Sequence, residues 1–425
     1  MIRLAPFGFL PIHRAAHGGH VGVLNLLLEV APECAKLATD SGLTAAAFAA
    51  SKGHVQALRL LLSKFPELAA QANEDGAVPA LMAAEEGHTA CLELLLAAAP
   101  VSAAAPAAGE GGKTAAHLAA THGHAAALEL IVKAAPSAAS ATTDTGITPA
   151  FCAAAYGHSE CLRLLLQVAP ETAAAPEQSG VTPAHFAAQE GHIGALSQIL
   201  AVAPASAGAV TERERGLKTP LHLAAAAGQA AAIERLLLAA PEAAAARDFT
   251  GATACQIAIE LGHKAVVAAL LHASPELAAI ADHRGYLPIH AAAAAGHNKV
   301  LEVIIRAAPQ CITAATPKGL NAAMLASLNG HVDSLKLLIA AAPELTAAVD
   351  DLRSTCTHLA AQEGHTECLQ LLLDVAPASA TAPSDDGWTP VHLAAMLGYD
   401  AALELLLAAA PEGASVLTDK GSTPR

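Results

Sequence analysis

The sequence predicts an all-α solenoid, built from a helix–turn–helix unit that recurs along the whole chain. Nine of the eleven intervals between successive copies of one glycine are 34 residues, and the other two are 36 and 37. A proline stands thirteen residues after every copy. A fixed period of this size is typical of repeat proteins, whose units pack against their neighbours. The glycines are Gly19, Gly53, Gly87, Gly123, Gly157, Gly191, Gly228, Gly262, Gly296, Gly330, Gly364 and Gly398.

Each unit contains the signals of two helices. A pair such as Thr219-Pro220 supplies an N-cap hydroxyl and a proline for the first helical position, and Gly228 ends that helix. The second helix carries a wide apolar stripe, as in "LELLLAAAP" (residues 92–100), and stops before its proline. A polar segment with glycine, such as residues 143–146, makes a turn. Helices of roughly 8–12 residues are marginal alone, so stacking must stabilise them.

The first helix carries a family resemblance. "TPAHFAAQEGH" (182–192), "TPLHLAAAAGQ" (219–229) and "TPVHLAAMLGY" (389–399) resemble the ankyrin repeat. The resemblance covers about residues 8–425 in twelve copies and implies two antiparallel helices and a protruding hairpin-like finger per unit. The chain departs from the family in one way: Ala-Pro replaces the glycine that usually closes the second helix, and the following connection is one residue longer.

The unbroken period predicts one solenoid over residues 1–425, with the start of a thirteenth unit at 419–425. Aromatic residues make up only 3% of the chain, which favours an aliphatic core in thin layers. The repeats follow one another without a linker or a long insertion, so there is no room for a catalytic domain. We therefore expect a protein that is not an enzyme. We expect residues 417–425 to be frayed, because a turn without its following helices has nothing to pack on.

Composition restricts the partners and the location. The formal charge of −15 argues against a nucleic-acid partner held through phosphates. The uncharged stretch 193–211 contains a proline and two serines and lies in register with the repeat, so we reject it as a membrane span. Residues 1–13 make a poor signal peptide. Cys91, Cys161 and Cys368 share one slot of the second helix, where we expect small buried hydrophobes. We therefore expect an intracellular, cytoplasmic protein.

The 21 histidines and one glycine-rich stretch suggest chemistry that the repeat explains better. Pairs such as His185 and His192 are seven residues apart, unlike the i, i+4 pair of a zinc protease, and we expect them to bond backbone groups at turns, as the family's histidines do. "AAGEGGKT" (107–114) nearly matches a phosphate-binding loop, but Ala107 fills its first glycine position and no buried strand precedes it. We expect an enlarged finger there, with no metal, cofactor, nucleotide or small-molecule substrate.

Function is expected at positions that vary while the frame repeats. The two residues before each mid-unit glycine should face a concave groove, and the finger positions vary as well. Trp, Tyr and Arg often dominate interface energies. We therefore predict a non-catalytic scaffold that binds a protein partner through its fingers and concave face, chiefly along units seven to twelve. By contrast, Phe48, Phe151 and Phe186 are expected in the core. The predicted binding residues are Tyr156, Arg213, Arg215, Phe249, Arg284, Tyr286 and Trp388.

Two other interpretations of the array stay open at the level of sequence. The array can serve as the targeting or regulatory part of a longer protein, such as an enzyme or a ubiquitin-ligase adaptor, because the chain ends on the first residues of another unit. It can also be a structural subunit of a stable assembly. The full-length transcript distinguishes the first interpretation, and co-purification at fixed stoichiometry distinguishes the second.

Overall fold

The computed structural model describes residues 8–419, and its regular structure over that range is helical, with isolated bridges in place of strands. This confirms the all-α prediction. Residues 420–425 of the expected thirteenth unit lie outside the described range. The α-helices are α1 (Pro11–His17), α2 (Val21–Val30), α3 (Ala45–Ser51), α4 (Val55–Lys64), α5 (Pro79–Glu85), α6 (Thr89–Ala98), α7 (Ala115–His122), α8 (Ala125–Ala134), α9 (Pro149–Ala155), α10 (Ser159–Val168), α11 (Pro183–Gln189), α12 (Ile193–Val202), α13 (Pro220–Ala226), α14 (Ala230–Ala239), α15 (Ala254–Glu260), α16 (Lys264–Ala273), α17 (Pro288–Ala294), α18 (Asn298–Ala307), α19 (Ala322–Leu328), α20 (Val332–Ala341), α21 (Cys356–Gln362), α22 (Thr366–Val375), α23 (Pro390–Leu397) and α24 (Asp400–Ala409).

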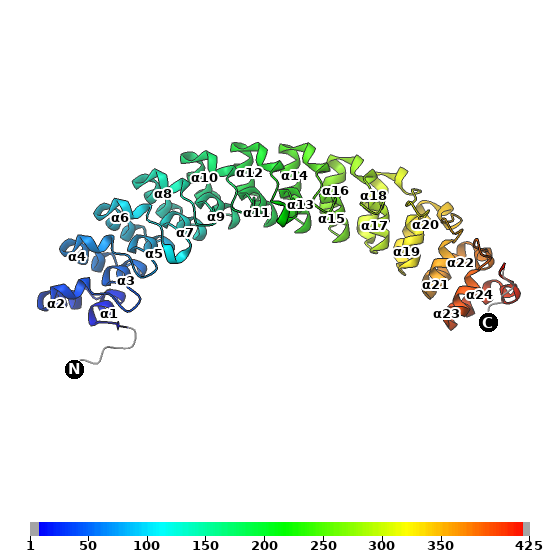
Figure 1. Ribbon diagram of the computed structural model, residues 1–425, viewed down its shortest axis with the longest axis horizontal. Coiled ribbons are helices and arrows are strands. Elements are labelled where there is room, and N and C mark those ends of the chain that lie inside the picture. The colour runs from blue at the N-terminus through cyan, green and yellow to red at the C-terminus, as the bar shows by residue number, and fades with distance from the viewer. Residues whose placement is uncertain (1–7, 420–425) are drawn as a thin grey trace. The chain divides into compact units, whose positions relative to one another are not determined.

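The contacts divide the chain into two compact units, unit 1 (Met1–Leu223) and unit 2 (Ala224–Arg425), with the division inside α13. Within unit 1 the odd-numbered helices α1 to α11 pack in one row and the even-numbered helices α2 to α12 in another (Figure 1). Unit 2 has the same two rows, α15 to α23 and α14 to α24. Within each unit the odd helices also pack on the even helices that follow them, so the helices are stabilised by their neighbours in the stack.

The ends of the helices follow the predicted signals. The Thr148 hydroxyl accepts from the Phe151 N–H at 3.1 Å and caps α9, and Pro149 stands at the first helical position. Gly157 takes the left-handed conformation, with φ +74°, one residue after the C-cap residue of that helix, Tyr156. The second helix of the unit, α10, ends before Pro170 as expected.

The proline that ends the second helix also begins a short 3₁₀ turn, which was not predicted from the sequence. Its fixed φ suits the first position of such a turn. The 3₁₀ turns of this kind are η2 (Pro32–Lys36), η3 (Pro66–Ala69), η4 (Pro100–Ala103), η6 (Pro136–Ser140), η7 (Pro170–Ala174), η8 (Pro204–Gly208), η10 (Pro241–Ala245), η11 (Pro275–Ala279), η12 (Pro309–Cys311), η13 (Pro343–Thr346), η14 (Pro377–Thr381) and η15 (Pro411–Ser415). Two more, η5 (Ala108–Glu110) and η9 (Arg213–Arg215), lie in fingers.

The histidines tie one repeat to the next through backbone carbonyls. In α11 the Thr182 N–H donates to His185 Nδ1 at 3.1 Å, so Nε2 carries the proton and donates to the Lys218 carbonyl at 3.0 Å. The histidines after the mid-unit glycines bond the preceding repeat. His158 Nε2, for example, bonds the Thr121 carbonyl at 3.0 Å. The expectation that histidines bond backbone groups is therefore confirmed for both kinds of position, as His185 and His158 show.

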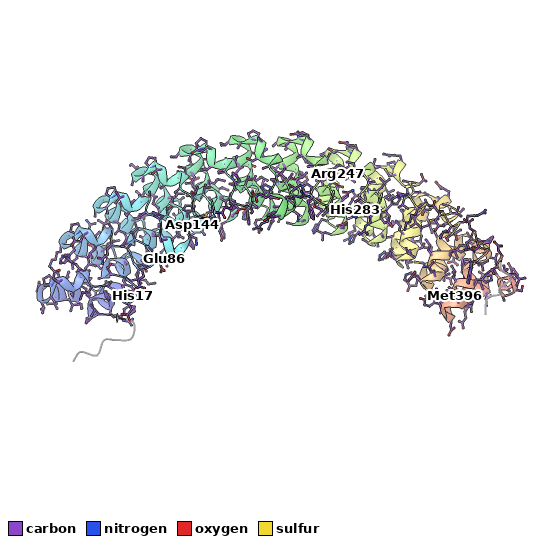
Figure 2. The ribbon with its side chains drawn as sticks, in the orientation of Figure 1. His17, Glu86, Asp144, Arg247, His283 and Met396 are labelled. Carbon is purple, nitrogen blue, oxygen red and sulfur yellow. The ribbon has the colours of Figure 1, made fainter. Side chains whose placement is uncertain are left out.

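Short fingers connect the helix pairs and bond to one another. Isolated antiparallel bridges such as Ala107–Lys113 close them. The Asp144 N–H donates to the Gly111 carbonyl at 2.9 Å, which joins two successive fingers. Residues 107–113, which nearly match a phosphate-binding loop, form one of these fingers, and it is enlarged as expected. Figure 2 shows Glu86 and Asp144 on the side of unit 1 away from the even-numbered helices.

The second-helix core is aliphatic and includes the cysteines. In α6, Cys91, Leu92 and Leu95 are fully buried, and each buried leucine contributes about 2 kcal/mol by leaving water. All eight cysteines are free thiols, and burial raises the pKa of Cys91 to about 11. The expectation that Cys91, Cys161 and Cys368 behave as small buried hydrophobes is confirmed. Among the described helices, none has the length and apolarity that crossing a membrane requires.

One finger of unit 2 has a residue that is not glycine in the left-handed region, and this predicts a stabilising substitution. Arg353 has φ +56°, where the equivalent Gly146 has φ +83°. Its ion pair with Asp385, at 3.8 Å between exposed groups, contributes little. We expect Arg353→Gly to stabilise unit 2 by about 1 kcal/mol in urea unfolding, because the left-handed conformation costs other residues about that much. Arg353→Ala, which keeps the strain, is the control; equal stability of the two variants would contradict the prediction.

Candidate functional site

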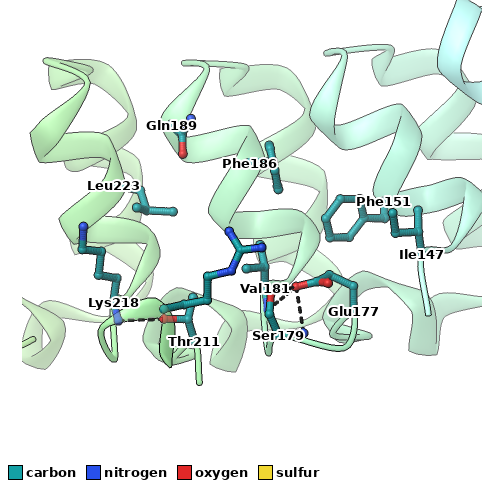
Figure 3. Close-up of a pocket in the computed structure, with 11 residues that line it drawn as sticks. Ile147, Phe151, Glu177, Ser179, Val181, Phe186, Gln189, Thr211, Lys218 and Leu223 are labelled. Carbon is teal, nitrogen blue, oxygen red and sulfur yellow. Dashed lines mark hydrogen bonds between the residues drawn. The ribbon is translucent and has the colours of Figure 1, made fainter. Parts of the chain in front are cut away.

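Two adjoining hollows lie between the fingers and the odd-numbered helices of unit 1. Their volumes are about 640 and 330 Å³, and both are lined by Ile147, Phe151 and Phe186. Figure 3 shows the smaller one, with Lys218 at one side and Ile147 and Phe151 at the other. We call the two hollows together the groove. Its lining is Lys113, Thr121, Thr143, Ile147, Phe151, Cys152, Ala155, Tyr156, Glu177, Ser179, Val181, Phe186, Gln189, Glu190, His192, Thr211, Arg215, Lys218 and Leu223.

Two phenylalanines form the floor of the groove. Phe151 occupies the position that carries His185 in the next repeat, and its ring meets that of Phe186 edge to face, with centroids 5.3 Å apart. Phe151 is 5% exposed, whereas Phe48 and Phe186 are only half-buried. The expectation of a core position is therefore confirmed for Phe151 and wrong for Phe48 and Phe186, which are only partly covered. The even-numbered helices cover one side of the odd-numbered row and leave the finger side open, so the rings face a groove.

The fingers supply the charges at the rim. Arg215 ends the 3₁₀ turn η9 of the lengthened finger 211–218, and Lys218 and Lys113 stand directly before the N-cap threonines of their repeats. Within residues 8–419, none of these three side chains takes part in an ion pair. The groove therefore has cationic groups at both ends of its apolar floor.

The two carboxylates that line the groove already have donors within the chain. Glu177 Oε1 accepts from the Ser179 N–H at 3.1 Å and from the Val181 N–H at 3.3 Å. Glu190 Oε1 accepts from Gln189 Nε2 at 3.1 Å. These bonds hold the carboxylates in place, and within residues 8–419 neither carboxylate forms an ion pair with the cationic groups of the groove.

The titratable groups in and behind the groove suit binding better than covalent chemistry. Burial lowers the pKa of His185 to about 4, so this imidazole is neutral at pH 7 and holds the Lys218 carbonyl. Burial also raises the pKa of the Cys152 thiol, which keeps it protonated and a poor nucleophile. Across the described residues 8–419, no three His, Cys, Asp or Glu side chains gather as a metal site requires. The arrangement offers apolar surface, hydrogen bonds and positive charge.

Comparison with models of known protein families shows to which family the chain belongs. Models of ankyrin repeats match residues 12–62, 43–96, 117–208, 185–281 and 345–418, which is most of the chain. The chain belongs to the ankyrin repeat family. Among solved structures it is similar to the human ASB11 ankyrin repeat domain at 21% identity, with a TM-score of 0.44, over 54% of this chain and 98% of that domain. No curated protein matches it. Ankyrin repeats are generally protein-interaction modules and are typically non-catalytic.

Three of the seven binding residues predicted for this ankyrin repeat chain lie at or beside the groove. Tyr156 is 60% exposed and lines the larger hollow, with its ring stacked on His158. Arg215 lines the smaller hollow, and Arg213 is exposed on the same finger. The structure thus brings Tyr156 and Arg215 to two hollows that share one aromatic floor.

The other four predicted residues belong to the ankyrin repeats of unit 2. Phe249 is 63% exposed and Arg284 is exposed, both on fingers. Tyr286 and Trp388 are half-buried, and their rings meet His290 and His392 edge to face at 6.1 and 5.7 Å. These two rings therefore also pack against their own repeats, so their truncation removes an internal contact as well as surface area.

Most of the groove was not predicted from the sequence, although the sequence carries one signal of it. The residue directly before the N-cap reads Lys113, Ile147, Val181 and Lys218 in four successive ankyrin repeats, two charged residues around two apolar ones. Phe151 also replaces the histidine that most repeats carry. These two differences at equivalent positions distinguish this stretch of unit 1 from the other repeats.

Proposed function

We propose that this chain is a non-catalytic scaffold, cytoplasmic in location, that holds a protein partner in the groove of unit 1. The observation that carries the proposal is the pair of hollows with a shared aromatic floor and a cationic rim. A concave site with an apolar lining and a few polar groups is the default expectation for a binding site. The predicted finger residues of unit 2, among them Phe249 and Trp388, supply further contacts for the same partner or for another one. The free buried thiols support a reducing compartment.

Site-specific photo-crosslinking tests this proposal. A photoreactive phenylalanine replaces Tyr156 in one protein and the exposed Leu238, on α14, in another. We expect discrete protein adducts from position 156 and none from position 238, because only the first position lines the groove. Equal adducts at both positions, or none at position 156, would remove the support for a partner in the groove.

The contribution of Tyr156 to the binding free energy is measured by a substitution. We expect Tyr156→Ala to weaken binding of the crosslinked partner by about 2 kcal/mol, roughly 30-fold, as for an aromatic anchor at an interface. Thermal stability should hardly change, because the side chain is mostly exposed. Leu238→Ala is the matched control, and an equal loss of affinity there would show that the groove does not set the affinity.

A further inference from the structure

We infer that the groove binds an extended peptide segment of a partner, with an apolar centre and acidic residues toward both ends. The inference rests on the proposed function and specifies the chemistry of the partner. The chain carries a formal charge of −15, yet three of the five Lys, Arg and Glu side chains that line the groove are positive. These three are Lys113, Arg215 and Lys218, against Glu177 and Glu190.

Charge complementarity selects an acidic occupant. The lining carboxylates of Glu177 and Glu190 are bonded to neutral donors and not to the cationic groups. The three cationic side chains therefore have no counter-ion within residues 8–419. Glu212 and Glu214 belong to the same finger as Arg215 but do not line either hollow. A carboxylate placed against Arg215 and Lys218 therefore gains attraction without displacing an existing partner.

The apolar floor of the groove favours apolar side chains in the centre of the bound peptide, between its acidic residues. Phe151, Phe186 and Ile147 are shared by both hollows, and Val181 and Leu223 extend the apolar lining of the smaller one. The hollow of about 640 Å³ accommodates a large apolar side chain beside Tyr156. Aromatic or large aliphatic anchors in such pockets contribute most of the binding energy at interfaces.

The distance between the cationic groups indicates that the bound peptide is extended. Lys113 and Lys218 occupy the same slot three repeats apart. With layers about one helix diameter thick, about 10 Å, they are separated by roughly 30 Å. An extended chain advances about 3.3 Å per residue, so about nine residues span that distance. Acidic residues about nine positions apart, with apolar residues between them, match the groove.

One residue of the cationic finger has an unusual backbone conformation that supports a binding role. Leu217 has φ +53° and follows Gly216, also left-handed at φ +93°. The Lys218 N–H donates to the Thr211 hydroxyl at 2.9 Å, and the Lys218 carbonyl accepts from His185. The base of the finger is thus held at both backbone groups of Lys218. Strain in a residue that is not glycine is often found at binding sites, where the surrounding structure maintains it.

Selection from a phage-displayed library of random peptides tests the inference on the full chain. We expect enriched peptides with an apolar centre and acidic residues on both sides. For a synthetic copy of one of them, Arg215→Glu with Lys218→Glu should raise Kd by at least about tenfold at low salt, and added salt should narrow the difference. The matched control reverses two exposed charges outside the groove, Lys133→Glu with Lys299→Glu, and should leave Kd within about twofold.

The outcomes separate this inference from the proposed function. Enrichment of basic or neutral peptides that lose binding in Tyr156→Ala would overturn the acidic partner and leave the groove as the binding site. Acidic peptides that bind equally well to the groove and control variants would overturn the inference, because the attraction would then come from elsewhere. A library without enriched peptides would also overturn it, whereas position-specific crosslinking at residue 156 would still support the proposed function.

Discussion

Acidification from pH 6.5 to pH 4 is expected to destabilise unit 1 strongly through two buried histidines. Burial lowers the pKa of His117 and of His185 from the ordinary 6.5 to about 4. Below pH 6.5 the unfolded chain therefore binds protons that the folded chain does not. Stability is fully present above pH 6.5 and is lost as the pH falls toward 4, by about 3 kcal/mol for each histidine. Urea unfolding followed by circular dichroism across this range measures the loss.

One repeat of the chain has a glutamine where most others have the buried histidine, and this suggests the control substitution. Gln256 occupies the equivalent slot in a later repeat, where its Oε1 accepts from the Thr253 N–H at 2.8 Å and its Nε2 donates to the Ile280 carbonyl at 3.2 Å. A glutamine keeps the neutral hydrogen-bonding pattern without a titrating group. His117→Gln with His185→Gln should therefore flatten the curve between pH 6.5 and 4, whatever its stability at pH 7. Parallel curves for the variant and the natural chain would mean that other groups, such as carboxylates, cause the acid sensitivity.

The second large effect is expected from a methyl group at a mid-unit glycine. Gly157 has φ +74°, and a Cβ there would lie 2.7 Å from His192 Nδ1 of the next repeat. Gly157→Ala therefore combines backbone strain with a clash at the contact between repeats. We expect a loss of about 3 kcal/mol in urea unfolding, of which about 1–2 kcal/mol is the left-handed conformation and the rest is overpacking.

A glycine in the same slot separates the two contributions. Gly398 has φ +75°, but a Cβ there would meet nothing within 4 Å. Gly398→Ala should therefore cost about 1 kcal/mol, from the backbone alone. If the two substitutions cost the same, the histidine of the next repeat moves aside freely and the glycine is required only for its conformation.

The sequence by itself was sufficient to predict the repeating frame. Helix starts such as Thr148-Pro149, helix ends such as Gly157 and the backbone bonds of the histidines depend on residues within one unit and on the constant step to the next. Such features repeat with the sequence, so periodicity and local capping signals reveal them. The 3₁₀ turns that begin at prolines were missed, because a proline that ends one helix does not by itself specify the conformation of the residues after it.

Only the tertiary structure decided which side chains meet along the groove. Phe151 and Phe186 are 35 positions apart in the sequence, and Lys113 and Lys218 are 105 apart, so no local pattern shows that they line one surface. Stacking places equivalent slots side by side, and the finger side of the odd-numbered helices stays uncovered. Exposure depends on what neighbouring repeats cover, and that is a property of the folded stack.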